Sequence, residues 1–286
     1  MHLQKFKKSY RLIALDIDMT LTNHERQMHP DDKEALFLLH NKGVHIALAS
    51  GRMTHSIRKF ARDKVGFDTD IIAYNGAMVW VQGRQEPVLH DPLPQKIAIQ
   101  IAREAEKLEK SGTTLAINCY LDDVLYAEKQ TPLTDLYYQR TKSEYSFVNM
   151  PISELLQTRT AAANNSPTKL LVLAENEVRN QLYQHFEQRY RDTTEVVKTD
   201  PEYLEFMKCG VNKGKAVLNL MRYYNIPDGL ALVFGDGNND IPMLQLENVV
   251  SFAMNNASDK VKSAANAVAP DAYGGVAACL RQVFVC

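Results

Sequence analysis

The first ninety residues contain three short apolar runs, each of which stops at a polar residue. Runs of this length, bounded by polar residues, are typical of strands that are buried on both faces of a sheet. The runs and the polar residues that end them are 11–15 before Asp16, 44–49 before Ser50, and 70–73 before Tyr74 and Asn75.

Helical signals separate these runs. Pro30 and Asp31 open one helix, and Lys42 and Gly43 close it, which matches the preferred chemistry of helix ends. A second helix is predicted from about Thr54. Strands and helices therefore alternate, and this predicts an α/β fold with a Rossmann-like, three-layer core around a parallel sheet.

The pattern changes in the middle of the chain. An amphipathic helix is followed by a hairpin around Asp122 and by further helices and strands, which together indicate an inserted α+β domain. The predicted elements are a helix over 94–110, strands over 113–118, 124–127 and 169–173, a helix over 178–190, and strands over 193–198 and 203–207. We expect residues 1–91 and 206–286 to form the α/β domain and residues 92–205 to form the insertion.

The alternating pattern resumes in the last third of the chain. A helix is predicted over 213–224 and a buried strand over 230–234, which stops shortly before Asp236. In open parallel sheets, ligands bind beyond the carboxyl ends of the strands. Asp16, Ser50 and Asp236 all fall at such ends.

Composition narrows the classes of protein. The 286 residues include 33 Lys and Arg and 34 Asp and Glu, a net charge of -1, which argues against a dedicated nucleic-acid binder. No apolar run approaches the roughly 20 residues that span a bilayer, and no secretory leader is recognisable. The four scattered cysteines fit a reduced, cytoplasmic protein without disulfides. The oligomeric state is left open.

Asp16 and Asp18 are the first pair of chemically informative residues. Residues two apart in an extended segment face the same side, so both carboxylates point into one crevice. Two such charges about 4 Å apart repel by about 4 kcal/mol at an effective dielectric near 20, so they favour a cation between them. Mg²⁺ with oxygen ligands suits a site that also binds phosphate. The alternative is a solvated turn that caps the next helix.

A second acidic segment, Gly235-Asp236-Gly237-Asn238-Asn239-Asp240, follows the strand over 230–234. Its glycines allow the backbone to approach a ligand closely. An ordinary Asn/Gly-rich turn would also explain the segment. Together with the first pair, however, it brings up to four carboxylates to strand ends, which turns alone explain poorly.

Two further segments can hold a phosphate. Ser50-Gly51-Arg52 offers a hydroxyl and backbone N–H groups at a strand end. Lys213, at a helix start, can neutralise a phosphoryl group, although Lys215 is a rival and a solvated surface charge is the ordinary alternative for any lysine.

These four segments, in this order, resemble the haloacid dehalogenase (HAD) superfamily of phosphohydrolases, in its Cof-type branch with an inserted C2-type cap. The resemblance covers essentially the whole chain, with the HAD core at both ends and the cap in the middle. It implies that Asp16 is the nucleophile and that Asp18 is the general acid/base.

The same resemblance assigns the remaining roles. It implies that phosphate or substrate is held by a group of backbone and side-chain donors, and that Mg²⁺ is held by carboxylates. The expected phosphate-binding residues are Ile17 through its N–H, Ser50, Gly51, Lys213 and Asn239, and the expected metal ligands are Asp16, Asp18, Asp236 and Asp240. One position departs from the family pattern, because Met19 stands where the family usually has glycine. Its side chain either narrows the pocket or packs into the core.

The expected function is a Mg²⁺-dependent phosphatase that acts on a small phosphorylated metabolite through an aspartyl-phosphate. Sugar phosphates, nucleotides and pyridoxal phosphate are the substrate types that the resemblance suggests. A capped phosphosugar mutase or a non-catalytic ligand-binding protein on the same fold remain as alternatives. The cap is expected to select the substrate, with Asn118, Tyr120 and Asp122 as candidate contacts.

Overall fold

The computed structural model describes residues 10–158, 166–270 and 273–284. The chain divides into two compact units: residues up to Leu89 together with those from Asn212 form the main unit, and His90–Val211 form the inserted unit. The expected limits were 91/92 and 205/206, so the first division lies two residues before its expected place and the second lies six residues after it. Residues 1–9 and Cys286 lie outside the described part of the chain.

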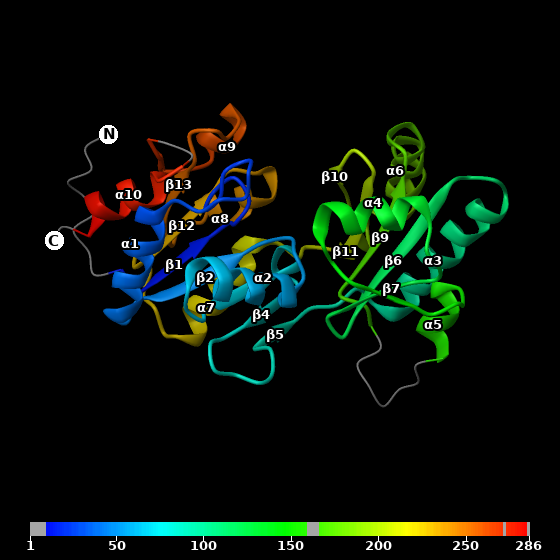
Figure 1. Ribbon diagram of the computed structural model, residues 1–286, viewed down its shortest axis with the longest axis horizontal. Coiled ribbons are helices and arrows are strands. Elements are labelled where there is room, and N and C mark those ends of the chain that lie inside the picture. Colours follow the sequence, from blue (N-terminus) through cyan, green and yellow to red (C-terminus); the bar gives the residue numbers. More distant parts are fainter. Residues whose placement is uncertain (1–9, 159–165, 271–272, 285–286) are drawn as a thin grey trace. The chain divides into compact units, whose positions relative to one another are not determined.

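The main unit is built on a sheet with the order β14-β13-β12-β1-β2-β3-β4-β5 (Figure 1). The first six strands in this order pair in parallel, and β4 turns back antiparallel to β3. The strands are β1 (Leu12–Leu15), β2 (His45–Ala49), β3 (Asp70–Ala73), β4 (Met78–Trp80), β5 (Leu89–His90), β12 (Ala231–Gly235), β13 (Val250–Ala253) and β14 (Ala267–Val268). The predicted parallel sheet is confirmed, with β1 at its centre.

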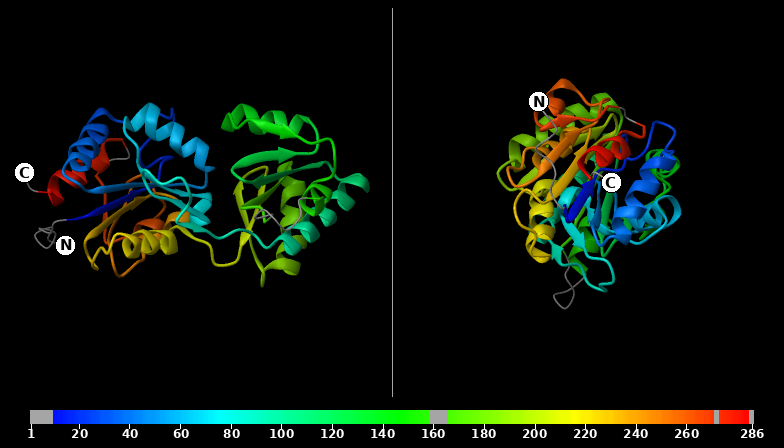
Figure 2. Two further views of the ribbon diagram at one scale, coloured as in Figure 1. Left: turned by 90° about the horizontal axis from the view of Figure 1, so that it is seen from below. Right: turned by 90° about the vertical axis from the view of Figure 1, so that its left-hand side faces the viewer.

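Helices cover both faces of this sheet (Figure 2). Small and branched residues of β1 and β2, such as Leu12 and Ala47, pack against helix α7 and its neighbours on one face. That face carries α7 (Lys213–Tyr223), α8 (Ile241–Leu244) and α9 (Asp259–Ser263). The opposite face carries α1 (Pro30–Asn41), α10 (Gly275–Val283) and α2 (Thr54–Phe60), which continues as a π-helical turn over Ala61–Val65.

The inserted unit has a mostly antiparallel sheet with the order β10-β11-β9-β6-β7-β8, in which only β7 and β8 pair in parallel among the described strands. Its elements are α3 (Gln95–Lys110), β6 (Leu115–Leu121), β7 (Val124–Ala127), α4 (Pro132–Thr141), β8 (Tyr145–Phe147), α5 (Ile152–Thr158), β9 (Lys169–Ala174), α6 (Asn176–Tyr190), β10 (Thr194–Asp200) and β11 (Tyr203–Lys208). Helices α3, α5 and α6 pack their apolar residues on one face, and α4 covers the other (Figure 2).

The predicted hairpin around Asp122 is confirmed. Asp122 and Asp123 have φ of 54° and 58°, which is the left-handed conformation that a tight two-residue hairpin turn requires. The first strand of this hairpin is Leu115–Leu121, which starts and ends later than the predicted 113–118. Across the described residues, no helix combines the length and apolarity that crossing a membrane requires.

Candidate functional site

Three carboxylates meet at the carboxyl edge of the main sheet. Asp16 directly follows β1 and Asp236 directly follows β12, so both acids stand at strand ends, as the sequence predicted. The two strands are neighbours in the sheet, which brings the acids together. Asp240 comes from the 3-10 turn Asn238–Asp240 directly beyond β12. Oxygens of these three carboxylates lie within 4.8 Å of one another.

Lys213 is the cation of this cluster. Its side chain is fully buried, and its Nζ donates to Asp16 Oδ1 at 2.5 Å and to Asp240 Oδ1 at 2.6 Å. The neighbouring Asn212 caps α7 by accepting from the N–H of Lys215, and this starts the helix so that Lys213 is buried and Lys215 is exposed. Of the two rival lysines, the structure brings only Lys213 to the carboxylates.

Burial and charge oppose each other in this pair. Burial raises the pKa of the Asp16 carboxyl, the Lys213 cation lowers it, and the nearby Asp240 raises it again, so that the net shift is well upward. Burial also disfavours the charge on Lys213, but Asp16 and Asp240 outweigh that effect and hold the pKa of the ammonium above its ordinary value. A protonated Lys213 is therefore a fixed positive charge beside Asp16.

Asp240 is bonded on both of its oxygens. Oδ2 accepts the backbone N–H groups of Asp236 and Gly237, at 2.9 and 2.8 Å, while Oδ1 accepts from Lys213. A side chain at Gly235 would be impossible, since its Cβ would lie only 2.5 Å from that of Asp240. Asp240 thus fixes the loop after β12 and orients Lys213.

Asp236 is held by two side chains from other segments. Its Oδ1 accepts from the Thr20 hydroxyl at 3.0 Å, and its Oδ2 accepts from Asn256 Nδ2 at 3.2 Å. Burial, reinforced by Asp240, raises the pKa of Asp236 to about 6. Asn256 follows β13 and was missed in the sequence, where asparagines in a loop carry no specific signal.

Asp18 stands apart from the three-carboxylate cluster. Arg52 binds both of its oxygens: Nε donates to Oδ2 at 2.9 Å, and the second guanidinium nitrogen donates to Oδ1. Half of the Asp18 side chain is exposed. Ile17, between the two acids, is fully buried, and its carbonyl accepts the N–H groups of Leu21 and Thr22.

The expected phosphate-binding residues lie along the same edge. Ser50 is buried directly after β2, and its Oγ accepts the N–H of Arg52 at 3.2 Å. A Cβ on Gly51 would lie 3.1 Å from Asn75 Oδ1, and Asn239 Nδ2 donates to that same oxygen at 3.0 Å. Ser50, Gly51 and Asn239 therefore belong to one packed group, joined by Asn75.

The donor set fits a divalent cation. With Asp16, Asp236 and Asp240 ionised, Lys213 neutralises only one of three charges, so two negative charges stay in excess. Buried excess charge is costly unless an ion compensates it, and carboxylate oxygens are the ligands that Mg²⁺ prefers. The described residues of the site thus bring a buried carboxylate, Asp16, next to a fixed cation, Lys213, and leave negative charge that a metal ion can neutralise.

Comparisons with known proteins agree with this geometry. The haloacid dehalogenase-like hydrolase family matches residues 13–280. The chain belongs to this family. The Cof-type branch that the motifs indicated is confirmed. The fold, a parallel sheet with helices on both of its faces, is that of the HAD hydrolases. The chain is a HAD-type phosphatase.

Three relatives illustrate how much of the HAD chain is shared. A solved structure, TM0651 from Thermotoga maritima, is 30% identical, with a TM-score of 0.85 over 96% of this chain and 97% of that one. The 5-amino-6-(5-phospho-D-ribitylamino)uracil phosphatase YitU of Bacillus subtilis is 24% identical over 96% of this chain and 97% of its own. The pyridoxal phosphate phosphatase YbhA of Escherichia coli is 26% identical over 91% and 93%.

Met19, the departure from the HAD pattern, has a clear backbone signature. Its φ is 65°, in the left-handed region that glycine adopts freely and other residues adopt at a cost. It is half-buried and does not belong to the buried apolar core of the described residues. Its carbonyl accepts from Asn256 Nδ2 at 3.1 Å. The methionine therefore has a backbone conformation that glycine would adopt freely, and its side chain is partly accessible.

The candidate substrate contacts of the inserted unit lie in different surroundings. Asn118 and Tyr120 are buried on the sheet face that α4 covers, where Asn118 Nδ2 donates to Tyr145 Oη at 2.8 Å and Tyr120 Oη bonds Tyr137 Oη. Asp122 is exposed in the hairpin turn. The first two are held by partners inside the inserted unit, and their contact with substrate stays a prediction.

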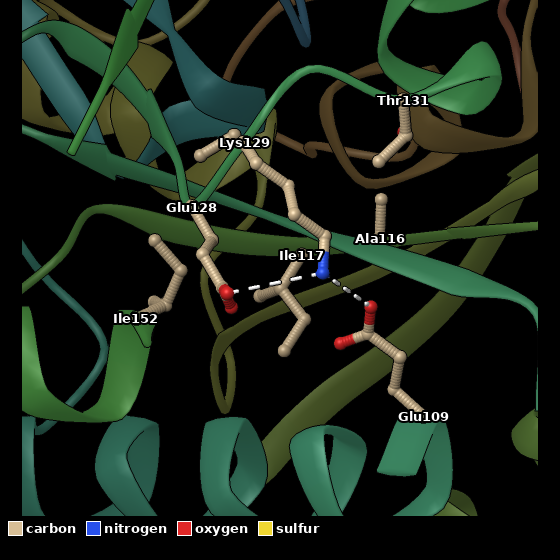
Figure 3. A pocket seen from close by; sticks show the side chains of 8 residues that line it. Glu109, Ala116, Ile117, Glu128, Lys129, Thr131 and Ile152 are labelled. Carbon is tan, nitrogen blue, oxygen red and sulfur yellow. Dashed lines mark ion pairs between the residues drawn. The ribbon is translucent and has the colours of Figure 1, made fainter. Parts of the chain in front are cut away.

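A small hollow also lies within the inserted unit (Figure 3). Lys129 crosses it and pairs with Glu109 at 3.4 Å and with Glu128 at 3.8 Å. The volume of the hollow, about 20 Å³, is close to that of a single water molecule. This hollow therefore has no room for a metabolite.

Proposed function

We propose that the protein hydrolyses a small phosphorylated metabolite in a Mg²⁺-dependent reaction that passes through an aspartyl-phosphate on Asp16. The observation that carries this proposal is the buried Asp16 carboxylate bonded to a fully buried Lys213 at the end of the central strand. A nucleophile next to a fixed cation suits attack on an anionic phosphoryl group.

The reaction has two steps. Asp16 attacks phosphorus, a bond forms between its carboxylate oxygen and phosphorus, and the bond to the leaving oxygen breaks while Asp18 donates a proton to that oxygen. Asp18 then takes a proton from water, which attacks phosphorus, releases inorganic phosphate and restores Asp16. Since Asp18 is paired with Arg52, it must exchange this partner for the leaving oxygen when substrate binds.

Charge stabilisation comes from residues around the phosphoryl oxygens. We assign this role to Lys213, the Ser50 hydroxyl and backbone N–H groups near Ile17 and Gly51, with Asn239 as a further amide donor. Bound Mg²⁺ would add positive charge next to the transferring group. Of the four expected ligands, Asp16, Asp236 and Asp240 have oxygens within 4.8 Å of one another, whereas Asp18 stands apart and is paired with Arg52.

The substrate class is proposed from the named relatives. Two of them are named for a ribitylaminouracil phosphate and for pyridoxal phosphate. Both names describe small polar heterocyclic phosphate monoesters, so we place this type beside sugar phosphates and nucleotides in the first group to test. We also propose a reduced cytoplasmic location, since Cys119, Cys209 and Cys279 form no disulfides.

The proposal is tested by measuring phosphate release from a panel of these metabolites and an aryl phosphate, with Mg²⁺ and after its removal by a chelator. We expect Asp16→Asn to abolish turnover, and chelation to abolish it reversibly. Asp70→Asn is the matched control, because Asp70 is also buried but stands at the amino end of β3. Activity retained by Asp16→Asn would contradict the assignment of Asp16 as the nucleophile. An isomerised product without free phosphate would favour a mutase.

A further inference from the structure

The turn that follows β3 has an unusual backbone. Tyr74, Asn75 and Gly76 have φ of 51°, 55° and 107°, three consecutive residues in the left-handed region. Tyr74 is fully buried, and a bulky residue in this conformation is rare. Such strain persists only where surrounding contacts impose it, and it is concentrated at functional sites.

The backbone of this turn is bonded to the Ser50–Arg52 loop. The N–H of Tyr74 donates to the Arg52 carbonyl, and the N–H of Asn75 donates to the Ser50 carbonyl, both at 3.0 Å. The Asn75 carboxamide packs on Gly51, where a Cβ would come within 3.1 Å of it. The strained turn thus determines the position of the loop that we expect to hold phosphate.

The same turn contacts the start of α7. A Cβ on Gly76 would lie only 2.4 Å from the carbonyl oxygen of Asn212, the residue before Lys213. No side chain fits there, so the two backbones touch directly. The position of Lys213 is therefore coupled to the turn through main-chain packing.

The third link is a side-chain bond. Asn75 Oδ1 accepts from Asn239 Nδ2 at 3.0 Å. On its other side, the Asn239 carboxamide lies against Gly237, where a Cβ would be 2.5 Å from Asn239 Oδ1. Asn239 is held between these two neighbours, and its amide has a second N–H that can be donated to a ligand.

We propose that Asn75 is a positioning residue of the phosphate pocket, and that it acts by holding Asn239 and the Ser50–Arg52 loop in one arrangement. The inference rests on the proposed function and deepens it. The left-handed backbone of Tyr74–Gly76 is what allows one carboxamide to reach both segments.

The test substitution is Asn75→Gly, which keeps the left-handed backbone and removes the carboxamide. Asn225→Gly is the matched control, because Asn225 has a φ of 50° but is exposed just after α7. We expect both variants to keep the melting temperature of the wild type or to raise it. Only Asn75→Gly should lower kcat/KM, by about tenfold, which corresponds to about 1.4 kcal/mol.

The way in which the loss of kcat/KM divides between KM and kcat separates a positioning role from a structural role. Since Asn239 is expected to hold phosphate in both ground and transition states, KM and the inhibition constant of inorganic phosphate should rise more than kcat falls. In an Asn239→Ala background, Asn75→Gly should cost less than it does alone, because only its packing on the Ser50–Arg52 loop remains to be lost. Additive losses in this double variant, or unchanged kinetics in Asn75→Gly, would overturn the proposal.

Failure of the proposed function gives a different result. If the wild type releases phosphate from no substrate, that function is wrong. The positioning role is then measured by calorimetric binding of inorganic phosphate in the presence of Mg²⁺, where Asn75→Gly should again bind about tenfold more weakly than Asn225→Gly. Equal or undetectable binding in both proteins would refute it.

Discussion

Two buried lysines, one in each unit, show how differently the protein uses the same kind of group. In the inserted unit, Lys169 of β9 pairs with Glu205 of β11 at 2.9 Å and lies over the Tyr120 ring at 4.7 Å. In the main unit, Lys213 bonds two carboxylates, and a third lies close by. Both ammonium groups are almost inaccessible to water.

The balance of charge separates the two sites. Lys169 and Glu205 neutralise each other, so this pair needs no further ion, and we interpret it as structural. When all three carboxylates around Lys213 are ionised, they exceed it by two charges, which is an arrangement that folding alone would not favour. Excess negative charge, rather than burial of a lysine as such, therefore distinguishes the proposed active site in this molecule.

The largest expected effect comes from replacing each lysine by methionine. Lys213→Met removes the cation beside Asp16, the proposed nucleophile, and should lower kcat by about 10²–10³-fold, as loss of a preorganised charge donor does. Lys169→Met should change kcat by less than a few fold at a temperature where it is folded. Steady-state kinetics on the best substrate of the panel measures both, and equal losses in the two variants would remove the distinction.

Stability should respond in the opposite way. Lys169→Met leaves Glu205 buried and unpaired and should cost about 3–5 kcal/mol, whereas Lys169→Met with Glu205→Leu should be close to the wild type. Urea unfolding, followed by a probe in the inserted unit, measures both values. A single variant as stable as the double variant would show that Glu205 reaches water when it lacks Lys169.

Asp70 extends the comparison to a buried acid that has no cation. It accepts from the N–H of Gln82 at 2.8 Å and from Tyr224 Oη at 2.9 Å, and burial, only partly offset by these bonds, raises its pKa to about 6. Because this pKa lies above the unfolded value of 3.8, the stability that Asp70 contributes is complete below pH 4 and is lost as the pH rises through 6.

A shift of this size corresponds to about 3 kcal/mol. We therefore expect Asp70→Asn to gain about that much stability relative to the wild type between pH 4 and pH 8. Unfolding free energies of the main unit at the two pH values provide the measurement. A difference between variant and wild type that does not change with pH would show that Asp70 is ionised in the folded protein.

The smallest expected effect concerns Met19. Met19→Gly should stabilise the main unit by about 0.5–1 kcal/mol, because glycine adopts the observed φ of 65° without the steric cost that methionine bears. A small rise in melting temperature measures this. Lys213→Met in the Met19→Gly background should keep its full kinetic defect, since relief of the turn does not replace the cation.

Much of the main unit could be predicted, because its parallel strands are short apolar runs that stop at polar residues. This pattern located Asp16, Ser50 and Asp236 at one edge of the sheet. The strands β4, β5 and β8 were missed, since two or three residues give no periodicity to read. Their pairing is decided by neighbours that the local sequence does not show.

The partners of the site residues could be predicted less well. The pairing of Arg52 with Asp18 and the bonds of Asn256 to Asp236 and to the Met19 carbonyl join segments that are separated in the chain. Asparagine and arginine are common in loops, so only the folded arrangement of the strands reveals which of them reach the carboxylates. The positive φ of Met19 was likewise hidden, because a methionine does not indicate a left-handed turn.

The pairing of β1 with β12 has a consequence for biosynthesis. Leu12 of β1 lies opposite Ala231 of β12, so 219 further residues must be translated after Leu12 before its pairing partner in β12 has been made. At about 5–20 residues per second, that delay is about 10–45 s, during which the whole inserted unit is translated. The nascent chain therefore exposes an apolar strand with one unpaired edge for many seconds, and its yield should depend on chaperones more than on the final stability of the enzyme.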